Sequence, residues 1–149
     1  MTLRPRMLFR IAAVISALYA AGHTFGFQAF RPPSAQGQAV FHAMNTVFFQ
    51  VDGARFSYGE FYLGFGLFVG AALLLVAVLT WWLGNLSIRS PDETVVPGAA
   101  ITAFHLMGMG LCLRFFSAAP AAFSAVIILL MVVAIVSARK TRQAAVGYK

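Results

Sequence analysis

Four long apolar segments, separated by polar connections, dominate the 149-residue chain. They cover residues 7–27, 61–83, 95–116 and 121–138. Each comes close to the roughly 20 residues that an α-helix needs to cross the hydrocarbon core of a bilayer. The pattern predicts an all-α integral membrane protein, in which a bundle of four transmembrane helices forms a single membrane domain over residues 1–149.

Two connections carry signals for helix ends. Only a short turn separates the third and fourth segments, and Pro120 stands where the first turn of a helix tolerates proline. These segments therefore predict an antiparallel helical hairpin. Before the third segment, the run Ser90-Pro91-Asp92-Glu93 predicts a capping box. In that motif Ser90 caps the helix and Glu93 reaches back to it.

The connection over residues 28–60 is long and predicts an outer cap. After Pro32 and Pro33, Ser34 can cap a short helix that Gly53 would end. Its apolar positions recur every three or four residues, as in a helix on the outer membrane surface. They are Ala35, Ala39, Met44, Val47, Phe48 and Val51. A loop of this length in a small protein is usually functional, and this one also holds polar side chains, namely Arg31, His42, Asp52, Arg55 and Glu60.

Composition excludes a soluble protein. The chain is 60% hydrophobic and 10% charged, with a mean hydropathy of +0.82. Soluble domains carry about 25% charged residues. The net charge of +7 would suit a nucleic-acid-binding protein only if the basic residues gathered on a polar face. They stand instead at the ends of the apolar segments, so we expect no nucleic-acid partner.

The lysine and arginine residues predict the orientation. One side of the membrane receives eight of them: Arg4, Arg6, Arg10, Arg89, Arg139, Lys140, Arg142 and Lys149. The other side receives Arg31, Arg55 and Arg114. The positive-inside rule then puts both termini in the cytoplasm, in a multi-pass protein of a bacterial inner (plasma) membrane. The first segment also has features of a signal peptide, but its long apolar stretch favours a retained helix.

Small residues four positions apart predict close helix packing. The pairs Gly22-x-x-x-Gly26 and Gly66-x-x-x-Gly70 allow helix backbones to approach each other. Packing within the chain's own bundle is the favoured interpretation, while a homo-oligomer or a partner in a membrane complex stays open.

Ionisable side chains near the outer ends of the predicted helices form a candidate ligand-binding site. His23 lies near the outer end of the first helix, Glu60 and Tyr62 open the second, and Arg114 lies near the outer end of the third. The connection above them supplies Arg55. Ionisable groups in a membrane are costly, so each is a functional candidate. Each also has a structural alternative, because Arg114 can reach lipid head groups, Glu60 can cap its helix and His23 can bond a backbone carbonyl.

His105 stands near the middle of the third segment and shares a helix face with Met109 and Cys112. Imidazole, thioether and thiolate are soft ligands that suit copper, but three ligands along one straight helix span two turns. At most two of them could chelate one ion, so a buried histidine bonded to Thr102 or across the bundle is favoured. His23 and His105 differ in depth by roughly 10 Å, which disfavours a haem with both as ligands. The sequence assigns no cofactor.

Two short motifs carry a resemblance. The runs Gly22-His23-Thr24-Phe25-Gly26 and Phe61-Tyr62-Leu63-Gly64-Phe65-Gly66 resemble small uncharacterised bacterial inner-membrane proteins with four helices. The resemblance covers the first half of the chain and implies no activity, cofactor or substrate. It picks out His23, Tyr62, Gly64 and Gly66 as motif positions.

The sequence thus favours a small membrane protein that binds a lipid, a quinone or another apolar molecule beneath the outer cap, alone or as an accessory subunit. One alternative is a membrane enzyme in which His23, beside Glu60, acts as general acid or base on a lipid-like substrate. Another is a purely structural subunit of a membrane complex.

Overall fold

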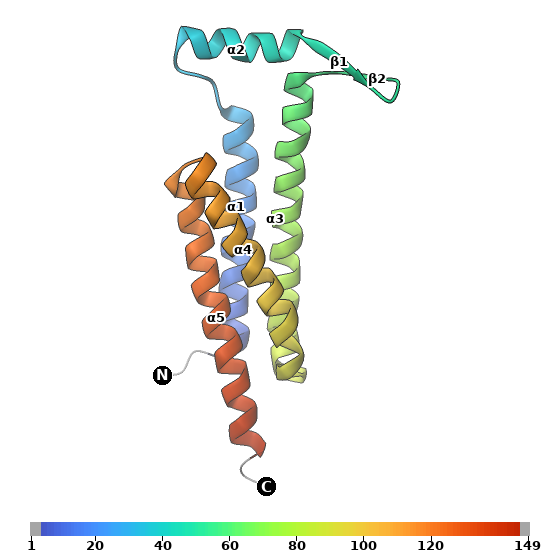
Figure 1. Ribbon diagram of the computed structural model, residues 1–149. Coiled ribbons are helices and arrows are strands. Elements are labelled where there is room, and N and C mark those ends of the chain that lie inside the picture. The colour runs from blue at the N-terminus through green and yellow to red at the C-terminus, as the bar shows by residue number, and fades with distance from the viewer. Residues whose placement is uncertain (1–3, 147–149) are drawn as a thin grey trace. The chain divides into compact units, whose positions relative to one another are not determined.

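The computed structural model describes residues 4–146, and side chains only as far as residue 140. Two of the basic residues used for the orientation therefore lie outside the described side chains, Arg142 and Lys149. The elements are α1 (Pro5–Ala29), α2 (Ala35–Thr46), β1 (Phe48–Val51), β2 (Ala54–Ser57), α3 (Tyr58–Arg89), the 3-10 turn η1 (Pro91–Thr94), α4 (Val95–Phe115) and α5 (Ala118–Val146) (Figure 1).

The chain divides into two compact units. We call Ala20–Ala72 the cap unit, and the rest, Met1–Tyr19 with Leu73–Lys149, the bundle unit. The bundle unit thus takes the first part of α1 and the later part of α3, together with α4 and α5. The cap unit takes the remainder of α1 and α3, with α2 and the two strands between them.

Four helices are long and apolar enough to cross a membrane: Pro5–Ala29, Tyr58–Arg89, Pro91–Phe115 and Ala118–Lys140. The predicted all-α fold with four transmembrane helices is confirmed, and the protein is a multi-pass membrane protein. The second helix is longer than the apolar segment predicted, because α3 continues beyond Leu83 to Arg89. Its last residues alternate polar and apolar side chains, and the helix ends one residue before Ser90-Pro91.

The core of the bundle unit lies along a seam of buried side chains. On α3 the seam includes Leu73, Ala77, Thr80 and Leu83, at the three- and four-residue spacing of helices that pack almost in parallel. The neighbouring positions Leu74, Leu75 and Val78 are exposed. The cluster of core residues draws on all four helices: Leu8, Phe9, Ala12, Val76, Leu83, Ile101, Ile127, Met131 and Ala134.

Buried hydroxyl groups in this core bond within their own helices. Ser16 donates to the carbonyl of Ala12 at 2.9 Å, and Thr102 donates to the carbonyl of Gly98 at 2.8 Å. Thr80 does the same with Val76 at 2.7 Å. Each of these three hydroxyl groups is satisfied four residues back along the chain, so none of them links two helices.

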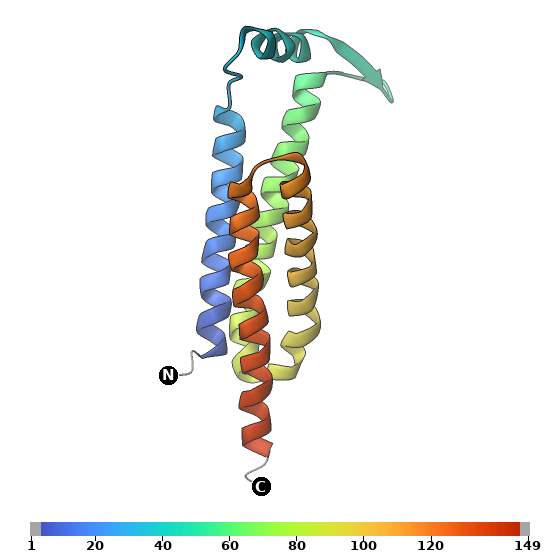
Figure 2. The ribbon, with the colours of Figure 1, turned by 60° about the vertical axis from the view of Figure 1, so that its left-hand side comes forward.

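The connections on either side of α4 differ in how well they were predicted. The helical hairpin is confirmed, since α4 and α5 lie side by side and Pro120 falls in the first turn of α5 (Figure 2). The prediction of a capping box at Ser90 is wrong. The side chain of Ser90 makes no cap bond, and its backbone carbonyl instead accepts from the Glu93 N–H at 3.1 Å. A 3-10 turn that begins at Pro91 has replaced the expected helix start.

In the cap unit, the predicted helix exists but ends earlier than expected. Ser34 caps α2 as predicted, because its hydroxyl accepts from the Gly37 N–H at 3.0 Å. The helix was expected to reach Val51, yet it ends at Thr46, and an antiparallel hairpin of β1 and β2 follows. Asp52 and Gly53 have positive φ angles of 49° and 82°, the conformation of a two-residue hairpin turn.

Candidate functional site

His23 bonds the backbone of the neighbouring helix within the cap unit. Its Nε2 lies 3.0 Å from the carbonyl oxygen of Gly66 on α3. A carbonyl can only accept, so Nε2 donates in this hydrogen bond. The ring is half-buried and lies parallel to that of Phe27, with 6.0 Å between the ring centroids. His23 is thus part of the contact between α1 and α3.

The glycine pair Gly66-x-x-x-Gly70 allows this contact. A Cβ added at Gly66 would overlap the ring of Phe27, and one added at Gly70 would overlap the hydroxyl of Thr24. Tyr62 packs on the same Phe27 ring, at 4.9 Å between centroids. The motif positions His23, Tyr62 and Gly66 therefore join two helices, whereas a Cβ added at Gly64 would meet nothing within 4 Å among the described residues.

Glu60 is engaged in a capping box at the start of α3. Its carboxylate accepts from the Ser57 N–H at 2.7 Å, and its own N–H donates to the Ser57 hydroxyl at 3.1 Å. This is the reciprocal pattern that was expected at Ser90. Glu60 precedes Gly66 by six residues, about 9 Å along the helix axis, so its carboxylate is held well away from the His23 contact.

The two arginines of the predicted site, Arg55 and Arg114, each pack against an aromatic ring. The guanidinium of Arg55 lies 4.3 Å from the ring centroid of Phe48 in the cap unit. That of Arg114 lies 5.2 Å from the ring centroid of Phe115 in the bundle unit. Every predicted ligand-binding residue, Tyr62 included, thus has a partner within its own unit. His23 thus bonds a backbone carbonyl and Glu60 caps its own helix, which are the structural roles that the sequence allowed for these two residues.

His105 is buried in the bundle unit, with 1% of its surface exposed. The expected bond to Thr102 does not form, because that hydroxyl donates to Gly98. Nε2 of His105 has no hydrogen-bond partner among the described residues. Cys112 instead contacts Tyr19, with its Sγ 3.6 Å from the phenol oxygen. Met109, which stands between His105 and Cys112 along α4, is half-buried. No group of three or more histidine, cysteine or acidic residues suited to a metal occurs in the described part of the chain.

A pocket of about 410 Å³ opens in the cap unit on one side of α2. Its lining residues are Arg31, Pro32, Gln38, Phe41, His42 and Asn45. Arg31 is held by two backbone carbonyls, those of Gln28 and Phe30, at 3.0 and 2.8 Å. Its guanidinium lies 5.8 Å from the ring centroid of Phe41. From the sequence, Arg31 and His42 were predicted only to be polar residues of the connection. The signal for the pocket was the spacing of residues 38, 41, 42 and 45, which share one helix face.

No family model, curated protein or solved structure matches the chain. The resemblance to small bacterial inner-membrane proteins stays a prediction. What the fold defines is the class, a multi-pass membrane protein with four apolar helices and, in the chain between the first two, a short helix and a β-hairpin.

Proposed function

We propose that the protein is a small binding module of a bacterial inner membrane, which holds an amphipathic molecule by its polar head in the pocket beside α2. Both termini then face the cytoplasm and the cap unit faces the outer side. The distribution of lysine and arginine between the connections supports this orientation.

The observation that carries the proposal is the donor-rich lining of the pocket. Arg31, Gln38 and Asn45 each use one side-chain nitrogen on a backbone carbonyl and carry further N–H groups beyond those bonds. The His42 imidazole adds another N–H group, and none of the lining residues is acidic. Such a lining favours a head group rich in acceptors, such as a phosphate, a carboxylate or the carbonyls of a quinone. The volume of about 410 Å³ lies in the range of small-molecule sites.

The apolar surface of the cap unit supports an amphipathic ligand over a purely polar one. Large apolar side chains there are exposed, among them Phe25 at 74%, Phe30 at 57% and Val40 at 62%. Exposed apolar side chains of this kind suit contact with the hydrocarbon of a membrane or of a ligand. An alkyl or isoprenoid tail can cover part of it while the head occupies the pocket.

Binding is favoured over acid–base catalysis because both proposed catalytic groups are engaged in the fold. His23 uses its N–H on Gly66, and Glu60 uses its carboxylate on Ser57. An acid–base pair would need both groups within reach of one substrate atom.

The experiment measures ligand retention by the purified protein. Wild type is incubated with a short-chain quinone, a fatty acid or a lysophosphatidic acid, and bound probe is quantified by mass spectrometry. Arg31→Gln removes the cation of the pocket and should lower the affinity for the retained probe at least about 10-fold. Arg55→Gln is the matched control, since Arg55 also rests on a phenylalanine of the cap unit but lies outside the pocket.

Equal retention by Arg31→Gln and Arg55→Gln would refute the pocket as the binding site. Retention of none of the three probes by wild type would count against a binding module altogether.

A further inference from the structure

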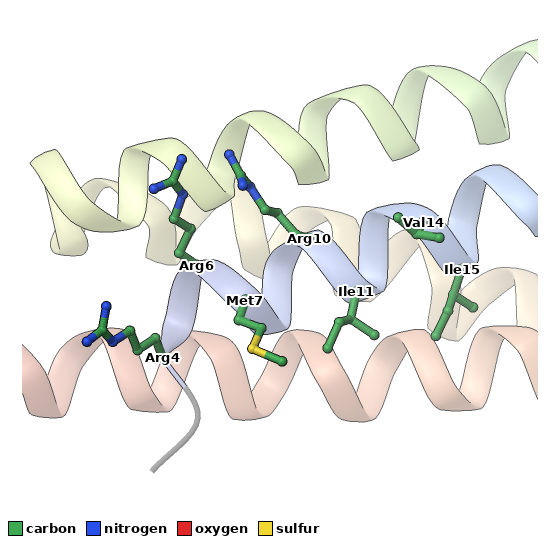
Figure 3. A pocket seen from close by; sticks show the side chains of 7 residues that line it. All are labelled: Arg4, Arg6, Met7, Arg10, Ile11, Val14 and Ile15. Atoms are coloured by element: carbon green, nitrogen blue, oxygen red, sulfur yellow. The ribbon is translucent and has the colours of Figure 1, made fainter. Parts of the chain in front are cut away.

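A second concave surface lies in the bundle unit, along the first half of α1 (Figure 3). This groove has a volume of about 410 Å³. Its lining residues all come from one helix: Arg4, Arg6, Met7, Arg10, Ile11, Val14 and Ile15. Neither the fold of the bundle nor the pocket of the cap unit accounts for it.

The groove combines cationic and apolar side chains. Arg4, just before α1, and Arg6 and Arg10 in its first turns supply the charge; Met7 lies between them along the chain, and Ile11, Val14 and Ile15 follow. Met7 is 52% exposed and Val14 is 49% exposed, so this side of α1 is not covered by the bundle unit. In Figure 3 the side chains of Arg6 and Arg10 extend to one side of α1, and those of Met7 and Ile11 to the other.

Arg10 is fixed in place by uncharged partners. One Nη atom donates to the side-chain oxygen of Asn85 at 3.3 Å, and the guanidinium lies 4.6 Å from the ring centroid of Trp81. Both partners come from α3 within the bundle unit. Its Nε has no hydrogen-bond partner among the described residues. The positive charge of Arg10 is therefore held in position without a carboxylate in the lining of the groove.

We infer that this groove binds one anionic phospholipid. The phosphate lies among the three arginines, and an acyl chain lies along Met7, Ile11, Val14 and Ile15. Charge complementarity selects an anionic head group, because guanidinium groups bind phosphate through paired, charge-assisted hydrogen bonds. The apolar wall selects a lipid over free phosphate, which would contact only the arginines.

The place of the groove on α1 fits this occupant. A helix that crosses a bilayer has its first turn at head-group depth, and each further residue lies about 1.5 Å deeper. The change from arginines to apolar side chains along α1 therefore follows the change from head group to hydrocarbon. In the proposed orientation this end of α1 lies in the cytoplasmic leaflet, where anionic lipids attract basic residues.

The test uses the full-length protein in micelles with equal amounts of phosphatidylglycerol and phosphatidylcholine of the same chain length. Native mass spectrometry then counts the lipids that stay bound. Wild type should retain a single phosphatidylglycerol in preference to phosphatidylcholine. The double variant Arg4→Gln with Arg6→Gln should weaken phosphatidylglycerol binding about 30-fold, because two basic contacts are lost.

The matched control is Arg89→Gln with Arg139→Gln. It removes the same charge from exposed arginines of the bundle unit that lie outside the groove, so binding should equal that of wild type. Met7→Glu tests the groove without removing an arginine, and should also abolish the preference by placing a carboxylate beside the phosphate. Free inorganic phosphate at millimolar concentration should displace no lipid.

Three results would overturn the inference: equal retention of the two lipids by wild type, equal losses in the groove variant and the control variant, or displacement by inorganic phosphate. The last would assign the arginines to a free anion. None of these three results depends on Arg31. The experiments can therefore refute lipid binding in the groove without refuting ligand binding in the pocket of the cap unit, and the reverse.

Discussion

At the scale of single residues, the roles of the candidate side chains follow from what each one reaches. The sequence placed His23 and Glu60 correctly near the ends of helices, but it could not tell how they pair. Periodicity gives the face on which a residue lies, not the atom that its side chain contacts. His23 reaches a carbonyl on α3, 43 residues away in the chain, and only tertiary packing brings the two together.

The contact between α1 and α3 in the cap unit should depend on Gly66. Gly66→Ala adds a methyl group where the ring of Phe27 lies, and overpacking of this kind costs about 1–3 kcal/mol. Thermal unfolding in detergent should therefore shift to lower temperature. Gly64→Ala is the control, because its Cβ would meet nothing within 4 Å. Equal unfolding temperatures for the two variants would contradict the packing role.

His105 should be a source of instability in the bundle unit. A buried polar atom without a partner costs about 1–3 kcal/mol, and Nε2 of His105 is such an atom. His105→Leu removes that cost and fills a similar space, so the unfolding temperature should rise. His105→Ala should lower it, because a cavity replaces the ring. A loss of stability in His105→Leu would mean that Nε2 has a partner, such as a buried water molecule.

At the scale of elements, the chain offers two runs of the form Ser-x-x-Glu, and only one forms a capping box. Ser57 and Glu60 exchange the two hydrogen bonds, while Ser90 and Glu93 do not. Ser57→Ala should cost about 1 kcal/mol of stability. Ser90→Ala should stay within about 0.5 kcal/mol of wild type, since no cap bond is lost. Chemical denaturation of both variants measures the difference, and a larger loss in Ser90→Ala would contradict the assignment.

The elements also show where sequence reasoning succeeds. The four membrane helices could be predicted because twenty consecutive apolar residues have few other stable arrangements. The hairpin of β1 and β2 was missed, although Asp52-Gly53 between Val51 and Ala54 is a strong signal for a two-residue turn. The periodicity of α2 continued by chance through Val47 and Val51. The helical interpretation therefore overrode the turn signal.

At the scale of the whole molecule, the proposed orientation in the membrane can be tested by the accessibility of single cysteine residues. In a chain with Cys112→Ser, Ala54→Cys on the hairpin should react with an impermeant thiol reagent added to intact cells. Lys140→Cys near the end of α5 should react only after the membrane is opened. Both positions are exposed, so burial does not limit the reaction. The reverse pattern would overturn the orientation and, with it, the leaflet proposed for the groove on α1.

The self-contained hydroxyl bonds of the bundle have a consequence for how the protein reaches the membrane. Ser16, Thr80 and Thr102 need no partner helix, because each bonds a carbonyl of its own helix. These three hydroxyl groups can therefore enter hydrocarbon with their own helix, without an unmet hydrogen bond, before that helix meets a partner. Biogenesis can then proceed helix by helix, with lateral assembly as a separate and later event.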